Sequence, residues 1–259
     1  MALLTCRFYS ETLGMSTSMT VILPQATRSQ IGMDNAAAAG KHKTLYLLHG
    51  LSDDDSIWVR RTSVERYVAE LGLAVVMPNV HRSFYADMEY GEAYWTFLTE
   101  ELPAVARSFF PLSEAREDNF VAGLSMGGYG AFKWALRHPD RFAAAGSFSG
   151  ALDIAARVGE VGQFDRIFKQ IFGDKQIQGS DDDLLALLAR SASGPNGERP
   201  LLYQSCGTED FLYNGNKAFR EACEKTDYKL TYSDGPGGHS WVYWDEHIQK
   251  FLKWLPLGK

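Results

Sequence analysis

Cysteine is scarce in this sequence, and long apolar runs are absent. Three cysteines, Cys6, Cys206 and Cys223, occur in 259 residues, far apart and without a C-x-x-C pair. This odd, scattered set indicates neither a disulfide framework nor a zinc site, and it favours small buried side chains in a reduced compartment. No stretch approaches the roughly 18 uninterrupted apolar residues of a membrane-spanning helix, so we expect no membrane insertion.

An excess of basic charge is also missing. The chain has 26 Lys and Arg against 32 Asp and Glu, which gives a formal net charge of −6 at pH 7. This mild acidity argues against nucleic acid or an anionic membrane surface as a partner. The N-terminal segment lacks the basic region and the apolar core of a signal peptide, which predicts a cytoplasmic protein unless a leader has been removed.

Nucleotide and metal motifs are lacking as well. There is no Gly-rich phosphate loop followed by Lys and no dinucleotide fingerprint. Two runs of three aspartates, 53–55 and 181–183, lack the alternating oxygen ligands and the closing Glu of a calcium loop, and we interpret them as loop and helix-capping residues. We therefore expect no metal ion and no cofactor.

The chain does contain a regular alternation of short apolar strands and amphipathic helices. A β-rich pair, 3–9 and 17–23, precedes it. Strands are then expected at 44–48, 73–77, 120–122, 142–148, 201–206 and 228–232, and helices at 64–71, 98–109, 130–136, 216–226 and 244–255. Pro103 breaks or kinks the second helix, or marks its first turn. The alternation predicts a mostly parallel sheet covered by helices on both faces, the α/β class.

A single domain over residues 1–259 fits this length and this alternation of strands and helices. Residues 151–198 interrupt the alternation with helical pieces at 164–172 and 181–190 and a Gly-Pro-Asn-Gly turn at 194–197. The segment is too short to fold alone, so we predict a small helical cap inserted between two strands. Ligands bind at the carboxyl ends of strands in such sheets, and these ends carry Gly50, Asn79, Ser125 and Ser149.

One of these residues lies in a G-x-S-x-G pentapeptide, Gly123-Leu-Ser-Met-Gly127, between a predicted strand and a predicted helix. A serine on such a tight corner projects its Oγ out of the sheet, and the N–H of the next residue, Met126, points to where an oxyanion would form. The flanking glycines are needed because a Cβ there would collide with the neighbouring strand or helix. The pattern predicts Ser125 as a nucleophile.

A serine hydroxyl needs a base to become nucleophilic, and the base needs an orienting carboxylate. In this architecture the chain order is serine, acid, histidine, each on a loop after a strand. Only His239, in a flexible loop after the last strand, satisfies that order. The other five histidines precede the serine or lie on helices: His42, His49, His81, His138 and His247.

The acid is expected just past the penultimate strand, where two carboxylates are adjacent. Asp210 is the favoured candidate, and Glu209 has the same topological place and remains the alternative. Asp234 lies on the loop of the histidine itself, which makes it too local to orient the imidazole.

A second backbone N–H is needed for the oxyanion, and in this architecture it comes from the loop after the third strand. The segment His49-Gly-Leu51 fits, with the Leu51 N–H as donor and His49 as a structural histidine that holds the loop. The carboxyl ends of the strands together form one edge of the sheet, called the rim below. Among the aromatic residues near the rim, Trp58, Tyr85 and Trp241 are the candidates to line an acyl or alcohol pocket.

Several segments together resemble the bacterial tributyrin esterases. They are Thr5-Cys-Arg-Phe-Tyr-Ser-Glu-Thr-Leu-Gly14, Tyr46-Leu-Leu-His-Gly50, Ser83-Phe-Tyr-x-Asp-Met88, Glu100-Glu-Leu-Pro103, Gly123-Leu-Ser-Met-Gly-Gly-Tyr-Gly-Ala131 and Gly237-x-His-Ser-Trp-x-x-Trp244. That family is part of the broader esterase D group, with S-formylglutathione hydrolases, feruloyl and acetyl-xylan esterases and mycolyltransferases. The resemblance covers nearly the whole chain. It implies an α/β-hydrolase fold and metal-free hydrolysis of short acyl esters.

The resemblance also implies site residues that agree with those found from topology. Ser125, Asp210 and His239 would form the triad, and the Leu51 and Met126 amides the oxyanion hole. The expected function is a serine carboxylesterase acting on small short-chain esters through an acyl-enzyme. The alternatives are a carbohydrate acetyl or feruloyl esterase, an S-formylglutathione-type thioesterase and an acyltransferase with the same triad. Whether the protein forms a homo-oligomer is left open.

One segment departs from a branch of this group. The S-formylglutathione hydrolases carry Ser-Gly-Leu-Thr-Cys at the oxyanion loop, where this chain has His49-Gly-Leu-Ser-Asp53. The difference counts against glutathione thioesters as the substrate.

Overall fold

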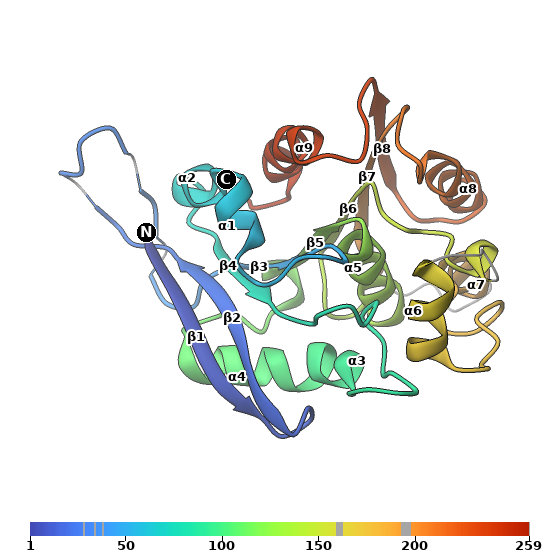
Figure 1. Cartoon of the computed structure of the whole chain (residues 1–259). Coiled ribbons are helices and arrows are strands. Elements are labelled where there is room, and N and C mark those ends of the chain that lie inside the picture. Colours follow the sequence, from blue (N-terminus) through green and yellow to red (C-terminus); the bar gives the residue numbers. More distant parts are fainter. Residues whose placement is uncertain (28, 34, 38, 159–162, 193–197, 259) are drawn as a thin grey trace.

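An eight-stranded sheet lies at the centre of the computed structural model, which describes residues 1–27, 29–33, 35–37, 39–158, 163–192 and 198–258. The strands are β1 Ala2–Ser10, β2 Met15–Leu23, β3 Thr44–Leu48, β4 Ala74–Pro78, β5 Asn119–Leu124, β6 Ala144–Phe148, β7 Leu201–Gly207 and β8 Leu230–Gly235. Their order across the sheet is β1-β2-β4-β3-β5-β6-β7-β8 (Figure 1). From β4 to β8 neighbouring strands run parallel, and β1 and β2 add an antiparallel edge. The predicted α/β-hydrolase fold is confirmed.

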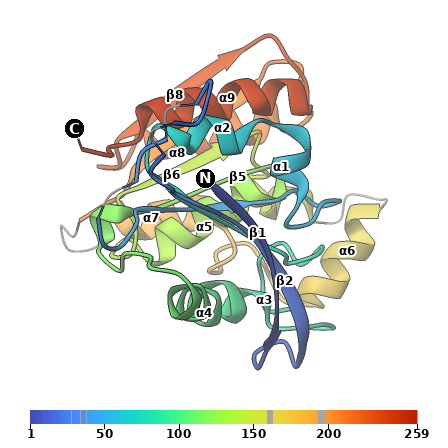
Figure 2. The same ribbon diagram turned by 90° about the vertical axis from the view of Figure 1, so that its left-hand side faces the viewer.

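Helices cover both faces of this sheet. They are α1 Ile57–Arg61, α2 Val64–Ala69, α3 Tyr94–Thr96, α4 Leu102–Phe109, α5 Met126–Arg137, α6 Gln163–Phe172, α7 Leu184–Ala192, α8 Tyr213–Cys223 and α9 Trp241–Trp254, with short turns at Phe97–Glu101, Arg116–Asp118 and Ala155–Arg157. In Figures 1 and 2, α1, α2 and α9 lie over one face, and α4 and α5 over the other. Within the described ranges, no helix has the length and apolar composition needed to cross a bilayer.

The central strands are apolar at every position because both of their faces are buried. On β3, Leu45 and Leu47 pack against the layer of α1, α2 and α9, whereas Tyr46 and Leu48 pack against the opposite layer. Consecutive side chains of a strand point to opposite faces, so a continuous apolar run serves two cores at once.

Pro103 is accommodated without ending its helix. It lies in the first turn of α4, directly after a π-helical turn at Phe97–Glu101, in which the Leu102 N–H donates to the Phe97 carbonyl. Pro103 has no N–H to donate to the Thr99 carbonyl one turn earlier, and that carbonyl accepts from the Arg141 guanidinium instead. Of the sequence alternatives for Pro103, the first-turn position is the one observed.

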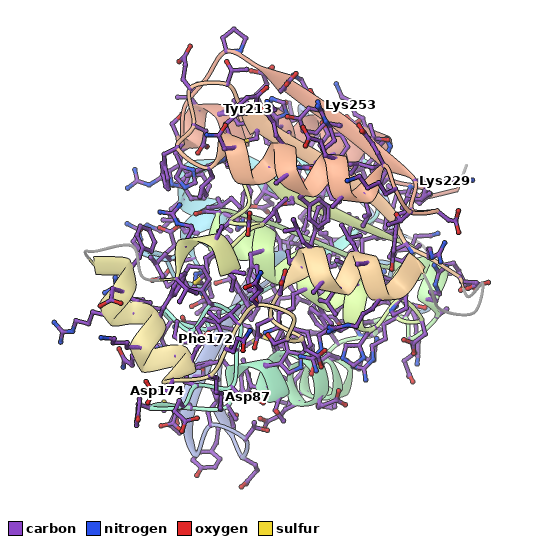
Figure 3. The ribbon with its side chains drawn as sticks, turned by 90° about the vertical axis from the view of Figure 1, so that its right-hand side faces the viewer. Asp87, Phe172, Asp174, Tyr213, Lys229 and Lys253 are labelled. Carbon is purple, nitrogen blue, oxygen red and sulfur yellow. The ribbon has the colours of Figure 1, made fainter. Side chains whose placement is uncertain are left out.

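The interrupting segment after β6 supplies α6 and α7, close to the expected helical pieces. Asp183 caps α7, since its carboxylate accepts from the Leu185 and Ala186 N–H groups at 3.0 and 3.1 Å. Backbone hydrogen bonds from Glu89 and Tyr90 hold the end of α6. Figure 3 shows Phe172 and Asp174 at this end of α6, with Asp87 beside them. The predicted turn at 194–197 lies outside the described residues.

Replacing Gly146 by Ala tests the packing of α9 on the sheet. A Cβ on Gly146 of β6 would lie 2.6 Å from the Phe251 ring of α9, so the ring or the helix must shift. Overpacking of this kind is expected to lower the free energy of unfolding by about 1–3 kcal/mol, measured by urea denaturation.

The matched control is Gly235→Ala on β8, where a new Cβ meets no atom within 4 Å. We expect this variant to stay within about 0.5 kcal/mol of wild type. An equal loss in both variants would show that the steric contact with Phe251 is not the cause.

Candidate active site

Ser125 occupies a strained turn between β5 and α5. Its backbone has φ 54° and ψ −118°, a left-handed conformation that is uncommon for a residue with a side chain. The Ser125 N–H donates to the Phe148 carbonyl at 2.9 Å, which ties the turn to β6. A Cβ on Gly123 would collide with the Gly127 backbone, and one on Gly127 with the Leu48 carbonyl. The predicted reason for both glycines is therefore confirmed.

His239 stands between this serine and a carboxylate. Its Nε2 lies 2.9 Å from Ser125 Oγ, and its Nδ1 lies 2.9 and 3.1 Å from the two carboxylate oxygens of Asp210. His239 is on the loop between β8 and α9, and Asp210 is on the turn after β7. Three segments that are distant in sequence thus meet at the carboxyl ends of β5, β7 and β8. The contact with Asp210 orients Nδ1 as the protonated nitrogen and leaves Nε2 free to accept from the serine hydroxyl.

The Asp210 carboxylate is fully buried but well supplied with hydrogen bonds. Its Oδ1 also accepts from the Leu212 N–H at 2.8 Å. Burial by itself raises the pKa of Asp210, but the hydrogen bonds from His239 and from the Leu212 N–H bring the pKa below its ordinary value. The carboxylate therefore remains ionised at neutral pH.

The two other acids considered from the sequence lie elsewhere. Glu209 has an exposed side chain, and its N–H donates to the Gly237 carbonyl. Asp234 accepts from the hydroxyls of Tyr213 and Tyr232 at 2.8 and 3.3 Å. Of the three carboxylates, Asp210 is the one that contacts His239.

The loop after β3 is held by His49. This side chain is 1% exposed, its Nδ1 lies 2.7 Å from the Gly50 carbonyl, and its Nε2 accepts from the Val80 N–H at 3.1 Å. A ring that accepts at Nε2 must donate at Nδ1, so the imidazole is neutral. Burial lowers the pKa of His49 to about 4, which agrees with that state. His49 is a structural residue, as predicted.

The backbone that follows His49 runs beside the serine. A Cβ on Gly50 would lie 3.8 Å from Ser125 Cβ and 2.8 Å from the Leu124 side chain, so a larger residue there would require the Leu124 side chain to move. Leu51 lines the same cavity as Ser125. Met126 is the first residue of α5, where an N–H has no partner within the helix and lies at the positive end of its dipole. Leu51 and Met126 therefore both remain candidates for the oxyanion donors, one in the cavity wall and one at the start of α5.

A cavity of about 650 Å³ has Ser125 and His239 in its wall. Its aromatic lining comes from Phe84, Phe164, Phe168, Phe211, Trp241 and Trp244. The charged residues at its wall are Asp53, Arg82 and Arg157. The lining is therefore mainly apolar near the serine, with a few charges, which is typical of a small-molecule site.

Of the three aromatic residues predicted to contact substrate, the structure places one at the cavity. Trp241 lines it. Trp58 is 1% exposed and its Nε1–H donates to the Leu48 carbonyl, and Tyr85 is fully buried with its hydroxyl donating to the His49 carbonyl. The prediction for Trp58 and Tyr85 is corrected: both lie beneath the rim, where they support its loops and are out of reach of a ligand in the cavity.

Several wall residues were not identified as site residues from the sequence. Phe164 and Phe168 lie on the apolar face of α6, which has the pattern of an ordinary buried helix. Phe211 is 60% exposed, and its ring lies 4.6 Å from that of His239, with Trp244 at 4.8 Å from the same imidazole. The position of Phe211 directly after Asp210 was the only sequence signal that could have indicated it.

A parallel sheet of this order, with a serine on a strained turn in hydrogen-bond reach of a histidine–aspartate pair, is the arrangement of serine hydrolases of the α/β-hydrolase fold. The chain belongs to the esterase family: the family model described as "Putative esterase" matches residues 10–255. It is a carboxylic ester hydrolase.

Individual relatives agree with this family. The chain is 30% identical over 263 residues to the acetyl esterase of Caldicellulosiruptor saccharolyticus, with 98% of each chain covered. Among solved structures, the fluorophosphonate-binding serine hydrolase FphF of Staphylococcus aureus has a TM-score of 0.87 and 36% identity, covering 100% of this chain and 99% of the other. The S-formylglutathione hydrolase FrmB of the same organism has a TM-score of 0.85 and 37% identity, covering 99% of each chain.

Replacing His49 by Gln is expected to reduce the loss of stability on acidification. The pKa of buried His49 is about 4, against about 6.5 in an unfolded chain. Between these values the unfolded chain binds a proton that the folded protein excludes. The free energy of unfolding therefore falls as pH drops from about 6.5 to 4, by up to roughly 3 kcal/mol. Urea unfolding of wild type and H49Q at pH 7 and pH 5 measures the difference.

His247 provides a comparison at a second buried histidine, because burial also lowers its pKa to about 4. H247Q should likewise reduce the fall in the free energy of unfolding between pH 7 and pH 5. It should leave esterase activity at pH 7 unchanged, since His247 is on α9 and away from the loop after β3. An H49Q protein with the pH dependence of wild type would contradict a neutral, buried His49.

Proposed function

We propose that the protein hydrolyses short-chain acyl esters, with Ser125 as nucleophile, His239 as general base and acid, and Asp210 as the orienting carboxylate. The observation that supports this most directly is the 2.9 Å separation between His239 Nε2 and Ser125 Oγ, with Asp210 at 2.9 Å from the other imidazole nitrogen. Both distances lie within hydrogen-bond reach, and the first allows proton transfer from Ser125 to His239.

The reaction follows from these positions. Ser125 Oγ attacks the ester carbonyl while His239 Nε2 takes its proton. Asp210 stabilises the imidazolium that forms and holds the ring in the correct orientation. The imidazolium then protonates the leaving alcohol, and an acyl-enzyme remains on Ser125. Water activated by the same imidazole cleaves the acyl-enzyme and releases the acid and the free serine.

Each half of the reaction passes through a tetrahedral oxyanion. We assign its stabilisation to the backbone N–H groups of Leu51 and Met126. Met126 is at the N-terminus of α5, where the helix dipole favours negative charge. Backbone donors that are fixed in place before the reaction stabilise the developing charge without reorganising.

The substrate class rests on the cavity and on the relatives. Its mainly apolar wall suits an uncharged acyl group, and a relative of nearly equal length is an acetyl esterase. The likeness to an S-formylglutathione hydrolase favours a second candidate, hydrolysis of a small thioester by the same residues. The acyl-enzyme route is common to both, so the leaving group distinguishes them.

Ser125→Ala is expected to lower kcat for p-nitrophenyl acetate by about 10⁴-fold or more, because the attacking atom is removed. A fluorophosphonate should label wild type at Ser125 and leave the variant unlabelled, read by peptide mass spectrometry. Ser108→Ala, an exposed serine on α4, is the matched control and should retain wild-type kcat. Hydrolysis by S125A at the wild-type rate would refute the assignment.

A series of p-nitrophenyl esters tests the acyl preference. We expect kcat/KM to be highest for acetate and butyrate and at least tenfold lower for dodecanoate, because a relative of nearly equal length is an acetyl esterase. S-acetyl and O-acetyl compounds with similar leaving groups, measured in parallel, separate the thioesterase from the esterase. A maximum at octanoate or beyond would contradict a short-chain specificity.

A further inference from the structure

Lys133 is a charged residue buried in the helix that follows Ser125. It lies two turns along α5, and its side chain is 1% exposed. Lysine is almost never buried to this extent unless its charge is paired, because moving an ammonium out of water is costly. The proposed reaction does not use Lys133, so its burial needs another explanation.

The ammonium of Lys133 has three partners on three different segments. Its Nζ donates to the Tyr85 carbonyl at 2.8 Å, lies 2.5 Å from an oxygen of Asp182, and sits 4.4 Å from the ring centroid of Trp95. An ammonium carries three donors on one atom, so a single lysine can join segments that no apolar side chain could join. Burial lowers the pKa of Lys133, and Asp182 opposes that shift.

The first partner, Tyr85, is in a strained segment of the rim. Phe84 and Tyr85 have consecutive φ values of 49° and 51°, each in the left-handed region. Such a conformation costs about 1–3 kcal/mol per residue and persists only where the surroundings hold it. The Tyr85 N–H donates to Ser83 Oγ at 3.1 Å, and Lys133 binds the Tyr85 carbonyl, so the residue is fixed at both of its backbone polar groups.

The other end of Tyr85 reaches the oxyanion loop. Its hydroxyl donates to the His49 carbonyl at 2.9 Å, and the His49 ring in turn binds the Gly50 carbonyl at 2.7 Å. The ring of Tyr85 lies directly on α5, where a Cβ on Gly130 would collide with it. A continuous series of contacts therefore leads from Lys133 through Tyr85 and His49 to the peptide that carries the Leu51 N–H.

We propose that Lys133 is a positioning residue for the oxyanion loop and acts through Tyr85. Its ammonium fixes the strained backbone of Tyr85, and the Tyr85 hydroxyl fixes the loop so that the Leu51 N–H faces the oxyanion. Asp182, which lies just before α7, pairs with the same ammonium and so connects it to the segment between β6 and β7. This inference rests on the proposed function, because it assigns the Leu51 N–H as an oxyanion donor.

A role in positioning differs measurably from a role in stability. Both acylation and deacylation pass through an oxyanion, so a misplaced Leu51 N–H slows the two steps together. Equal slowing lowers kcat and leaves KM nearly unchanged. A variant that is merely less stable, but still folded at the assay temperature, would keep its kcat per folded molecule.

The test compares Tyr85→Phe, Lys133→Met and the double variant with wild type. Tyr85→Phe removes one hydroxyl and keeps the buried ring, and Lys133→Met keeps the apolar stem without the charge. We expect each single change to lower kcat for p-nitrophenyl acetate by about 10–100-fold, by analogy with the loss when a residue that orients a metal ligand is replaced. KM should stay within about twofold of the wild-type value. Because the two residues act in series, the double variant should lose no more than about threefold beyond the larger single loss.

Lys169→Met is the matched control. Lys169 is an exposed lysine on α6 whose partner, Asp165, lies 3.7 Å away at the surface, and its replacement should leave kcat unchanged. Urea midpoints establish that each variant is folded. Fluorophosphonate labelling of wild type at Ser125 checks the proposed function separately: absence of labelling would reject that function, whatever the variants do.

The inference is overturned if folded Tyr85→Phe and Lys133→Met both keep kcat within twofold of wild type. It is also overturned if the loss of kcat in the double variant equals the product of the two single losses. Such a product would show that the two residues act independently and not through one another. Should Lys133→Met fail to fold, Tyr85→Phe decides the matter: a wild-type kcat there removes the link to the loop, and a tenfold loss with unchanged KM supports it.

Discussion

The left-handed backbone of Ser125 is a constraint that the surrounding structure must satisfy. A residue with a Cβ holds φ 54° only where neighbouring groups compensate for the strain. Here the Ser125 N–H is bound by the Phe148 carbonyl, and its own carbonyl accepts from the N–H groups of Tyr129 and Ala151. These bonds connect the turn to β6, to α5 and to the segment after β6. The strained turn is thereby held by several parts of the fold, and the Ser125 hydroxyl is kept facing the His239 imidazole.

Polar groups buried beneath the rim complete this support. Asp210, His49 and Lys133 are each removed from water, and each has its hydrogen bonds supplied by fixed neighbours. Such groups are costly when unpaired and rigid when paired, because a small displacement would leave a buried charge or dipole without a partner. A rigid lower layer suits a reaction in which donors must be in place before the charge develops.

The residues above the rim have a different origin. The strand ends supply Ser125, Asp210 and His239, to which we assign the reaction. The cavity wall comes instead from segments between strands: Phe84 from the loop after β4, and Phe164 and Phe168 from α6. Hydrogen bonds from Glu89 and Tyr90 to the end of α6 make these two wall segments one unit. Changes at Phe164 and Phe168 can therefore alter which ester fits while leaving Tyr85 and the proposed catalytic side chains in place.

The amino-acid sequence was enough to predict the sheet, the tight turn at Ser125 and the choice of His239 as the candidate base, because these depend on local apolar patterns, on glycine and on the order of elements along the chain. The choice between Asp210 and Glu209 required the structure, since neighbouring residues on a turn point in different directions. The positions of Trp58 and Tyr85 were predicted wrongly because composition near a rim does not tell whether an aromatic ring faces the cavity or the core. The burial of Lys133 was not predicted, because a lysine in a helix is expected to be exposed to solvent. Only long-range packing places Tyr85 and Asp182 around its ammonium.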